Sequence, residues 1–193
     1  MRYFPISIDT KNKRVAVLGG GKIAGRKIKT LLNSELCFDV YAEEFDSSVQ
    51  KEYENYTDRI VLIQCHIDEN FEFENYDFCL LATNDKKLNH YLSIKAKTGG
   101  LLVLDTSNLE NCDFTLNKLV LKNAIAIGVS TNGKSPTVAK LVGKEIENLV
   151  DKYNDEELEK IFETRKTLKE KNCKNIGEII EKMWASMPNN LDA

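Results

Sequence analysis

The sequence predicts an α/β protein built on a parallel β-sheet. Up to about residue 107, short apolar runs alternate with amphipathic stretches, and each run is apolar throughout rather than at every second position. Strands of this kind are buried on both faces, which is typical of parallel sheets covered by helices. Their alternation with helical patterns of about ten residues indicates consecutive β-α-β units.

The elements follow one another regularly in the first half of the chain. We expect strands at 14–20, 37–42, 59–65, 76–84 and 101–107. We expect helices at 22–33, 45–55 and 86–99. After about residue 112 the pattern changes: 114–123 and 124–130 favour a β-rich pair, and the chain from Pro136 onward favours helix, with proline at the first helical position.

Composition narrows the class of protein. The chain has 193 residues, 27 basic and 30 acidic, with a net charge of −3, so no global attraction for nucleic acid or an anionic membrane is expected. Its five cysteines form no close pair and no metal-binding spacing, and no secretory signal is recognised, which favours a reduced, cytoplasmic protein. No apolar stretch approaches the roughly 20 residues of a membrane helix.

A glycine cluster joins the first strand to the first helix. Gly19, Gly21 and Ala24 form the pattern G-x-G-x-x-A within a β-α-β unit. The first glycine permits the tight turn, the second lets a pyrophosphate approach the backbone, and the small third residue allows close helix–strand packing. The helix N-terminus then attracts the phosphates. The alternative is a tight strand–helix turn without a ligand.

Two further segments are candidates for the same cofactor. Glu43 and Glu44 follow the second strand, where the dinucleotide fingerprint places an acid for the ribose 2′-hydroxyl, and no arginine is near in sequence to accept a 2′-phosphate. This favours NAD over NADP. Thr83, Asn84 and Asp85 end the fourth strand beside the expected cleft, where they contact ribose or substrate, or else cap the next helix.

A second glycine cluster competes for the nucleotide. Residues 128–136, GVSTNGKSP, satisfy the P-loop pattern G-x-x-x-x-G-K-[ST]. However, Pro136 lacks the backbone N–H that a P-loop uses at this point, and no downstream strand offers an acid for Mg²⁺. The segment is therefore a turn that leads into a proline-started helix, or an anion site in which Lys134 and Ser135 receive a substrate carboxylate.

Several strings in a fixed order make the chain resemble the precorrin-2 dehydrogenase family, which also forms the N-terminal module of bifunctional siroheme synthases. The matching strings are FPI at 4–6, VLGGGKIAGRK at 17–27, ATND with a following LN at 82–89, LDTSN at 104–108, CDF at 112–114 and STNGKSP at 130–136. They span about residues 1–150, and the ordered set is far more specific than any one motif.

The resemblance implies a fold, a reaction and an assembly. Family members have a Rossmann domain, here 1–112, a dimerisation segment, here 113–148, and a small α-helical domain, here 149–193. They oxidise the tetrapyrrole precorrin-2 to sirohydrochlorin with NAD⁺ in siroheme (porphyrin-type) biosynthesis, and some then insert Fe²⁺, a lyase reaction. They are homodimers. The alternative from another class is a non-catalytic NAD-binding sensor.

The resemblance also assigns residues. It implies catalysis by Asp105, in both dehydrogenation and chelation, and NAD contacts at Lys22 and Ile23 as well as at Glu43 and Glu44. The sequence adds that Asp105 ends an apolar strand, where ligands of open α/β sheets bind, although a strand-end aspartate also caps turns. We expect no resident metal, because His66 and His90 are far apart in sequence.

Two positions depart from the family pattern. Leu102 stands where family members usually carry asparagine, and Asn132 replaces one glycine of the usual GGKSP string. Neither change removes one of the assigned functional groups. Asparagine tolerates a left-handed backbone better than most residues, so we expect the turn before Pro136 to persist.

Overall fold

The computed structural model describes residues 2–187, and it divides the chain into two compact units, 1–116 and 117–193. Phe114 and Leu116, which follow the sequence-based boundary at 112, pack against the core of the first unit. Among the described residues, no helix is long and apolar enough to cross a membrane.

The first unit contains the predicted parallel sheet. Its five strands are β1 (Arg14–Leu18), β2 (Cys37–Ala42), β3 (Ile60–Gln64), β4 (Phe78–Leu81) and β5 (Leu102–Asp105). They lie in the order β3-β2-β1-β4-β5, and every neighbouring pair is parallel. This order reverses direction beside β1, which creates a crevice at the carboxyl ends of β1 and its neighbours.

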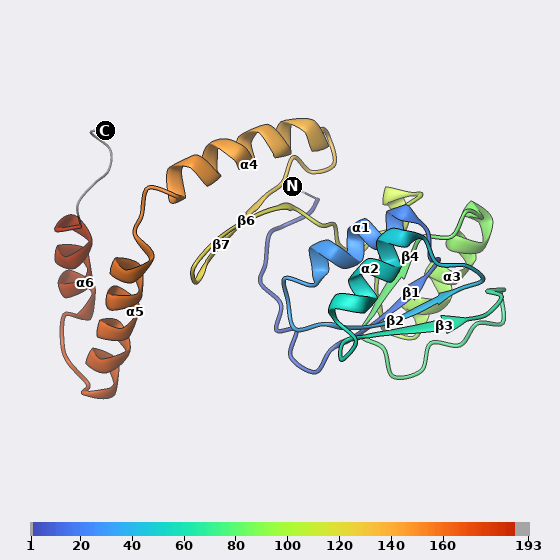
Figure 1. Cartoon of the computed structure of the whole chain (residues 1–193), viewed down its shortest axis with the longest axis horizontal. Coiled ribbons are helices and arrows are strands. Elements are labelled where there is room, and N and C mark those ends of the chain that lie inside the picture. Colours follow the sequence, from blue (N-terminus) through green and yellow to red (C-terminus); the bar gives the residue numbers. More distant parts are fainter. Residues whose placement is uncertain (1, 188–193) are drawn as a thin grey trace. The chain divides into compact units, whose positions relative to one another are not determined.

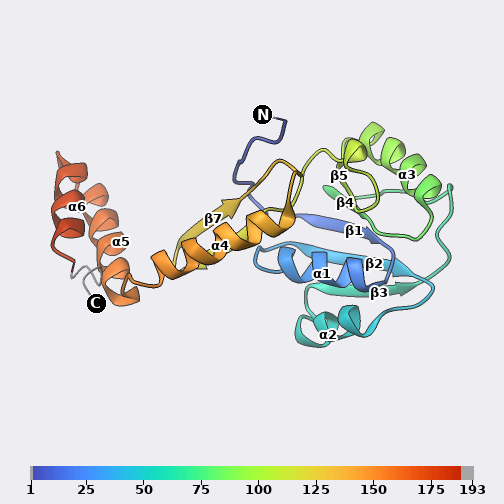
Figure 2. The same cartoon turned by 90° about the horizontal axis from the view of Figure 1, so that it is seen from above.

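Helices cover both faces of this sheet, as Figures 1 and 2 show. The helices are α1 (Lys22–Leu31), α2 (Ser47–Asn55) and α3 (Lys86–Thr98). Val15 and Val17 face the core beneath α1 and α2, whereas Leu18 faces the core beneath α3. Because successive residues of β1 reach opposite cores, the strand must be apolar throughout, which confirms the α/β fold predicted from its sequence.

Arg59 fixes the connection between α1 and β2. Its guanidinium donates to the main-chain carbonyls of Leu32 (3.3 Å), Ser34 (2.5 Å) and Leu36 (2.8 and 3.1 Å). It also lies 5.7 Å from the centre of the Tyr56 ring. One half-buried side chain thus provides hydrogen-bond donors to three main-chain carbonyl groups of the segment that follows α1.

Replacing Arg59 with alanine should lower the free energy of unfolding by about 2 kcal/mol, because several hydrogen bonds from one charged group are lost. Arg59→Lys should recover part of this, since an ammonium keeps the charge but not the planar fork. Urea denaturation measures both variants. An unchanged midpoint in Arg59→Ala would show that the loop is held by other contacts.

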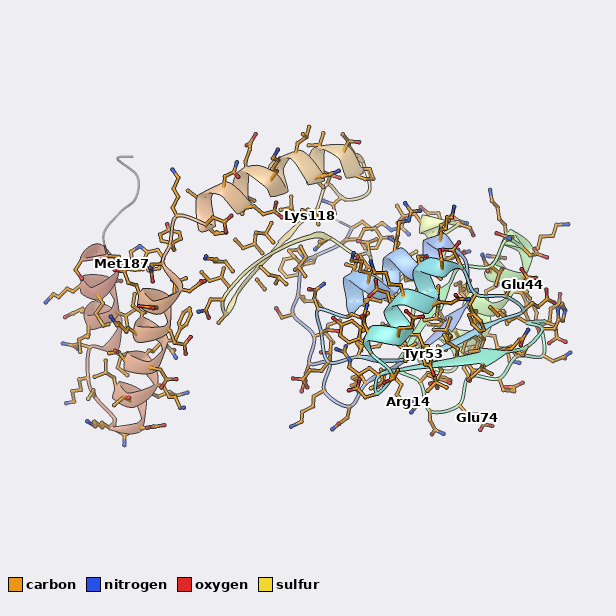
Figure 3. All side chains as sticks on the ribbon, in the orientation of Figure 1. Arg14, Glu44, Tyr53, Glu74, Lys118 and Met187 are labelled. Carbon is orange, nitrogen blue, oxygen red and sulfur yellow. The ribbon has the colours of Figure 1, made fainter. Side chains whose placement is uncertain are left out.

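The second unit begins with an antiparallel ribbon, β6 (Lys118–Lys122) and β7 (Ile125–Val129), which packs against α4 (Pro136–Val150). Lys118, labelled in Figure 3, lies between the ribbon and the helix. Its ammonium pairs with Glu147 at 2.5 Å, and its aliphatic stem crosses Gly143, where an added Cβ would be only 2.6 Å from Lys118 Cγ. Gly143 therefore sets how closely ribbon and helix approach.

Two further helices follow in the described part of the second unit. They are α5 (Asp155–Glu170) and α6 (Ile176–Ala185), which pack together as a pair. Asn154 caps α5 by accepting hydrogen bonds from the amides of Glu156 and Glu157. The predicted β-rich pair and the helical C-terminal part are both confirmed.

Candidate cofactor and catalytic site

A cavity of about 890 Å³ lies at the carboxyl ends of β1, β2, β3 and β4. It is lined by residues 19–21, 42–46, 65–69, 82–85 and 87–88. Figure 3 labels Glu44 at this edge and Arg14 at the start of β1, toward the opposite end of the sheet. The volume is in the range of natural cofactor sites, about 300–1,000 Å³.

The backbone before the cavity approaches its neighbours very closely. Gly19 has φ +114°, and a Cβ there would lie 2.4 Å from the carbonyl oxygen of Ala82. At Gly20 a Cβ would lie 2.3 Å from the carbonyl oxygen of Glu44. Both positions therefore require glycine in the folded protein, with or without a ligand.

Gly21 is different, because a Cβ added there would meet no protein atom within 4 Å. Its backbone is extended (φ −83°, ψ 179°), and it is the N-cap of α1 without a capping side chain in the described structure. The helix start is thus open toward the cavity, with its N–H groups and positive dipole end available to an anion. These features fit the pyrophosphate of a dinucleotide.

Carboxylates form the wall at the β2 side of the cavity. Glu43 pairs with His66 (Oε1–Nδ1 2.5 Å), whereas the Glu44 side chain has no ion pair or hydrogen bond among residues 2–187. Asp46 caps α2 by accepting from the hydroxyl and the amide of Ser48. These two hydrogen bonds, the hydroxyl's first, hold the pKa of the Asp46 carboxyl below its usual range.

On the β4 side of the cavity, the wall includes the residue that caps α3. Asp85 caps α3 by accepting from the amides of Lys87 and Leu88, at 2.8 and 3.1 Å. The Thr83 hydroxyl donates to Asn89 Oδ1 at 2.6 Å, and Asn89 is fully buried. Capping thus belongs to Asp85, while Thr83 and the exposed Asn84 line the cavity.

Asp105 ends β5 next to this site but does not line the cavity. Its side chain is 3% exposed. Oδ1 accepts from the amide and the hydroxyl of Ser107, both at 2.7 Å, and Oδ2 accepts from Asn111 Nδ2 at 2.7 Å. The side-chain amide oxygen of Asn111, Oδ1, in turn lies 3.0 Å from His90 Nδ1. Asp105 therefore makes the turn contacts expected of a strand-end aspartate.

The remaining candidates lie outside the cavity wall. Lys22 and Ile23 are exposed on the first turn of α1, and Ala24 is buried against the sheet, which is the packing role predicted for it. Ser135 caps α4 by accepting from the amide of Val138 at 3.2 Å. Lys134 is exposed on the turn before this helix.

The turn before α4 also settles the P-loop question. Asn132 (φ +51°) and Gly133 (φ +78°) both have left-handed backbone, which confirms that asparagine supports this turn. β7 pairs only with the antiparallel β6 in the described structure and is not part of the parallel sheet. The strand before this turn therefore lacks the parallel-sheet context of a P-loop strand.

The sequence did not identify Gly20 or the loop after β3 as site residues. Gly20 could have been recognised from the GGG run, because its carbonyl accepts from the Asp46 amide at 2.8 Å and so joins two cavity loops. Residues 65–69 carry no pattern of their own. They reach the cavity because β3 lies next to β2, which the local sequence does not reveal.

Two families match the chain. The family described as putative NAD(P)-binding matches residues 6–118, and the one described as sirohaem biosynthesis protein central matches residues 123–149. The first covers the unit that contains the cavity. The second covers β7 and α4.

Individual relatives agree with these matches. A siroheme synthase from Psychrobacter sp. (strain PRwf-1) is 31% identical over 152 residues, and one from Psychromonas ingrahamii is 33% identical over 150 residues. Each alignment covers 78% of this chain, but the chain spans only 30% and 31% of the length of those relatives. A solved structure named SirC, precorrin-2 dehydrogenase, matches with a TM-score of 0.72 at 22% identity, covering 93% of this chain and 88% of the other.

Proposed function

Because the chain belongs to the family described as putative NAD(P)-binding, and a sirohaem-biosynthesis central segment follows, we propose that it oxidises precorrin-2 to sirohydrochlorin with NAD⁺. The observation that supports it most directly is the open glycine turn at Gly21, which faces a cavity of about 890 Å³. The names of the siroheme synthase relatives support the choice of substrate.

The residues of this chain have separate tasks in the proposed reaction. Gly19 and Gly21 shape the pyrophosphate site, and Glu43 and Glu44 receive the adenosine ribose. Thr83 and Asn84, which follow β4, also line the cavity. When bound, the nicotinamide accepts a hydride, so the protein must also remove one proton from the substrate, a task we assign to the carboxylate of Asp105.

The substrate carries carboxylate groups, and the second unit offers contacts for them. We assign this role to Lys134 and Ser135, which lie at the start of α4, where the helix dipole favours an anion. Two other lysines of this unit have partners within it: Lys118 pairs with Glu147 and Lys122 with Asp155.

The acidic cavity wall should give a preference for NAD⁺ over NADP⁺, because a 2′-phosphate beside Glu44 would be repelled. Glu44→Ser should weaken NAD⁺ binding about 10-fold and narrow the difference between the two cofactors. Calorimetric titration of each cofactor measures both effects. Glu54→Ser, which removes an exposed carboxylate of α2 outside the cavity, serves as the control. Equal losses in the two variants would contradict the assignment.

The exposed apolar face of α4 fits a homodimer, in which a second copy of this chain would cover it. Val138, Leu141, Val142 and Leu149 are 39–59% exposed and share one side of the helix. Leu141→Glu should convert a dimer to a monomer in analytical ultracentrifugation. Lys140→Glu, on the polar side of α4, should leave the dimer intact. A wild-type protein that sediments as a monomer would refute this part of the proposal.

The function is tested by anaerobic incubation with precorrin-2 and NAD⁺, following NADH by its absorbance. Turnover above a control without enzyme supports the dehydrogenase. NAD⁺ binding without turnover would instead support a dinucleotide-binding sensor. Fe²⁺ added to sirohydrochlorin in the same setup tests ferrochelation, which the family resemblance implies for some members.

A further inference from the structure

The burial of Asp105 raises the question of how its carboxylate could meet a substrate. The side chain is 3% exposed and lies outside the cavity wall. Three protein hydrogen bonds, two from Ser107 and one from Asn111, already surround it. A carboxylate enclosed in this way receives a proton most directly through a neighbouring group that is itself accessible.

Ser107 is such a neighbour. It is only half-buried, and its hydroxyl donates to Asp105 Oδ1 at 2.7 Å. Ser107 Oγ also accepts a longer hydrogen bond, 3.4 Å, from Asn89 Nδ2. The Ser107 hydroxyl therefore connects the buried carboxylate with the region around the cavity wall.

Asn89 determines the direction of these bonds. Its Oδ1 accepts from the Thr83 hydroxyl at 2.6 Å, so its Nδ2 must face the Thr83 carbonyl (3.2 Å) and the Ser107 oxygen. Because Asn89 donates to that oxygen, the hydroxyl proton of Ser107 remains directed at Asp105. Thr83 lines the cavity, so the chain of bonds extends from the cavity wall to the carboxylate.

We propose that Ser107 is the catalytic residue that meets the substrate and that it relays the proton to Asp105. This inference rests on the proposed function. As the substrate C–H bond breaks, its hydrogen and both bonding electrons would leave as a hydride to the bound nicotinamide. The proton that the substrate also loses bonds to Ser107 Oγ, and the electron pair of its former bond stays on the substrate. In the same step the Ser107 proton moves to Asp105 Oδ1, and the carboxylate becomes a carboxylic acid. Asn89 is a positioning residue that holds the hydroxyl in line.

Steady-state kinetics of Ser107 variants test the relay. Ser107→Ala should lower kcat about 100-fold and leave the KM for NAD⁺ within about 2-fold. Ser107→Thr restores a hydroxyl and should recover most of the activity. Ser93→Ala is the matched control, because Ser93 is a buried serine of α3 whose hydroxyl donates to the carbonyl of His90 in the same helix. Its kcat should equal that of the wild type.

A double variant distinguishes a relay from two independent roles. If Ser107 and Asp105 act in one step, Ser107→Ala combined with Asp105→Asn should lose no more activity than the worse single variant. Losses that multiply, or a Ser107→Ala variant as active as Ser93→Ala, would overturn the relay.

A second readout does not depend on turnover. In the ligand-free protein with ¹³C-labelled aspartate, Ser107→Ala should shift the Cγ resonance of Asp105, which is identified by its absence in Asp105→Asn. Ser93→Ala should leave it in place. A wild-type protein without turnover would refute the proposed function, whereas an unshifted resonance in Ser107→Ala would refute the relay separately.

Discussion

Substitution of Gly21 by valine is expected to weaken NAD⁺ binding at least about 30-fold, or about 2 kcal/mol, and to leave the ligand-free fold intact. A Cβ at this position meets no protein atom within 4 Å, and the extended backbone accepts any residue. The added isopropyl group would instead occupy the space before the start of α1, where we place the pyrophosphate. Calorimetry measures the affinity, and thermal unfolding measures the fold.

Substitutions at two other glycines serve as comparisons for Gly21→Val. Gly19→Ala should destabilise the unit itself, because the new Cβ would collide with the Ala82 carbonyl at a backbone angle unsuited to alanine. Gly177→Val, at the start of α6, adds the same side chain in open space far from the cavity in sequence and should change neither property. NAD⁺ affinity unchanged in Gly21→Val would place the cofactor elsewhere.

The sequence predicted every strand of the sheet, because burial on both faces leaves a continuous apolar run in each one. It placed the carboxyl ends of β4 and β5 too far along the chain. The strand predicted to reach residue 84 ends at Leu81, and the one predicted to reach residue 107 ends at Asp105. In both places side-chain oxygens bond to main-chain amides and turn the chain, an effect that apolar patterning does not report.

The candidate site was predictable only where local sequence creates it. The glycine turn and the carboxylates after β2 are contained in one β-α-β unit, and both line the cavity. Asn89 and Asn111 were not recognised, because an asparagine in a helix or loop is usually exposed. Here they are 0% and 7% exposed. Asn89 contacts Ser107 from α3, 18 residues earlier in the chain, and Asn111 contacts Asp105 from the turn six residues after it.

Leu102 shows how the fold changes the meaning of a sequence difference. It departs from the family pattern three residues before Asp105, and it lies at the amino end of β5, paired with Phe78. A strand rises about 3.3 Å per residue, so Leu102 is about 10 Å from the strand end that carries Asp105. We therefore expect this leucine to affect the edge of the sheet rather than the cavity.

Replacement of Asp105 by asparagine should lower turnover at least about 100-fold, because an amide cannot take the substrate proton. NAD⁺ affinity should stay within about 3-fold of wild type, since the carboxylate does not line the cavity. The variant should also lose about 1–2 kcal/mol of stability, because its new amide group faces the Asn111 amide that now donates to Oδ2. Kinetics, calorimetry and urea denaturation separate the three quantities.

Asp39→Asn is the control that separates catalysis from folding. Asp39 is another buried strand carboxylate, 6% exposed, which pairs with the Arg14 guanidinium and accepts from the Tyr76 hydroxyl at 2.6 Å. It lies toward the amino ends of the strands, so its loss should lower stability but not the turnover of the folded protein. If both variants lost stability and both kept full turnover, Asp105 would be a turn-forming residue only, and the proton acceptor would have to lie elsewhere. A 100-fold loss in Asp105→Asn alone would establish that its carboxylate has a catalytic role in addition to the turn contacts.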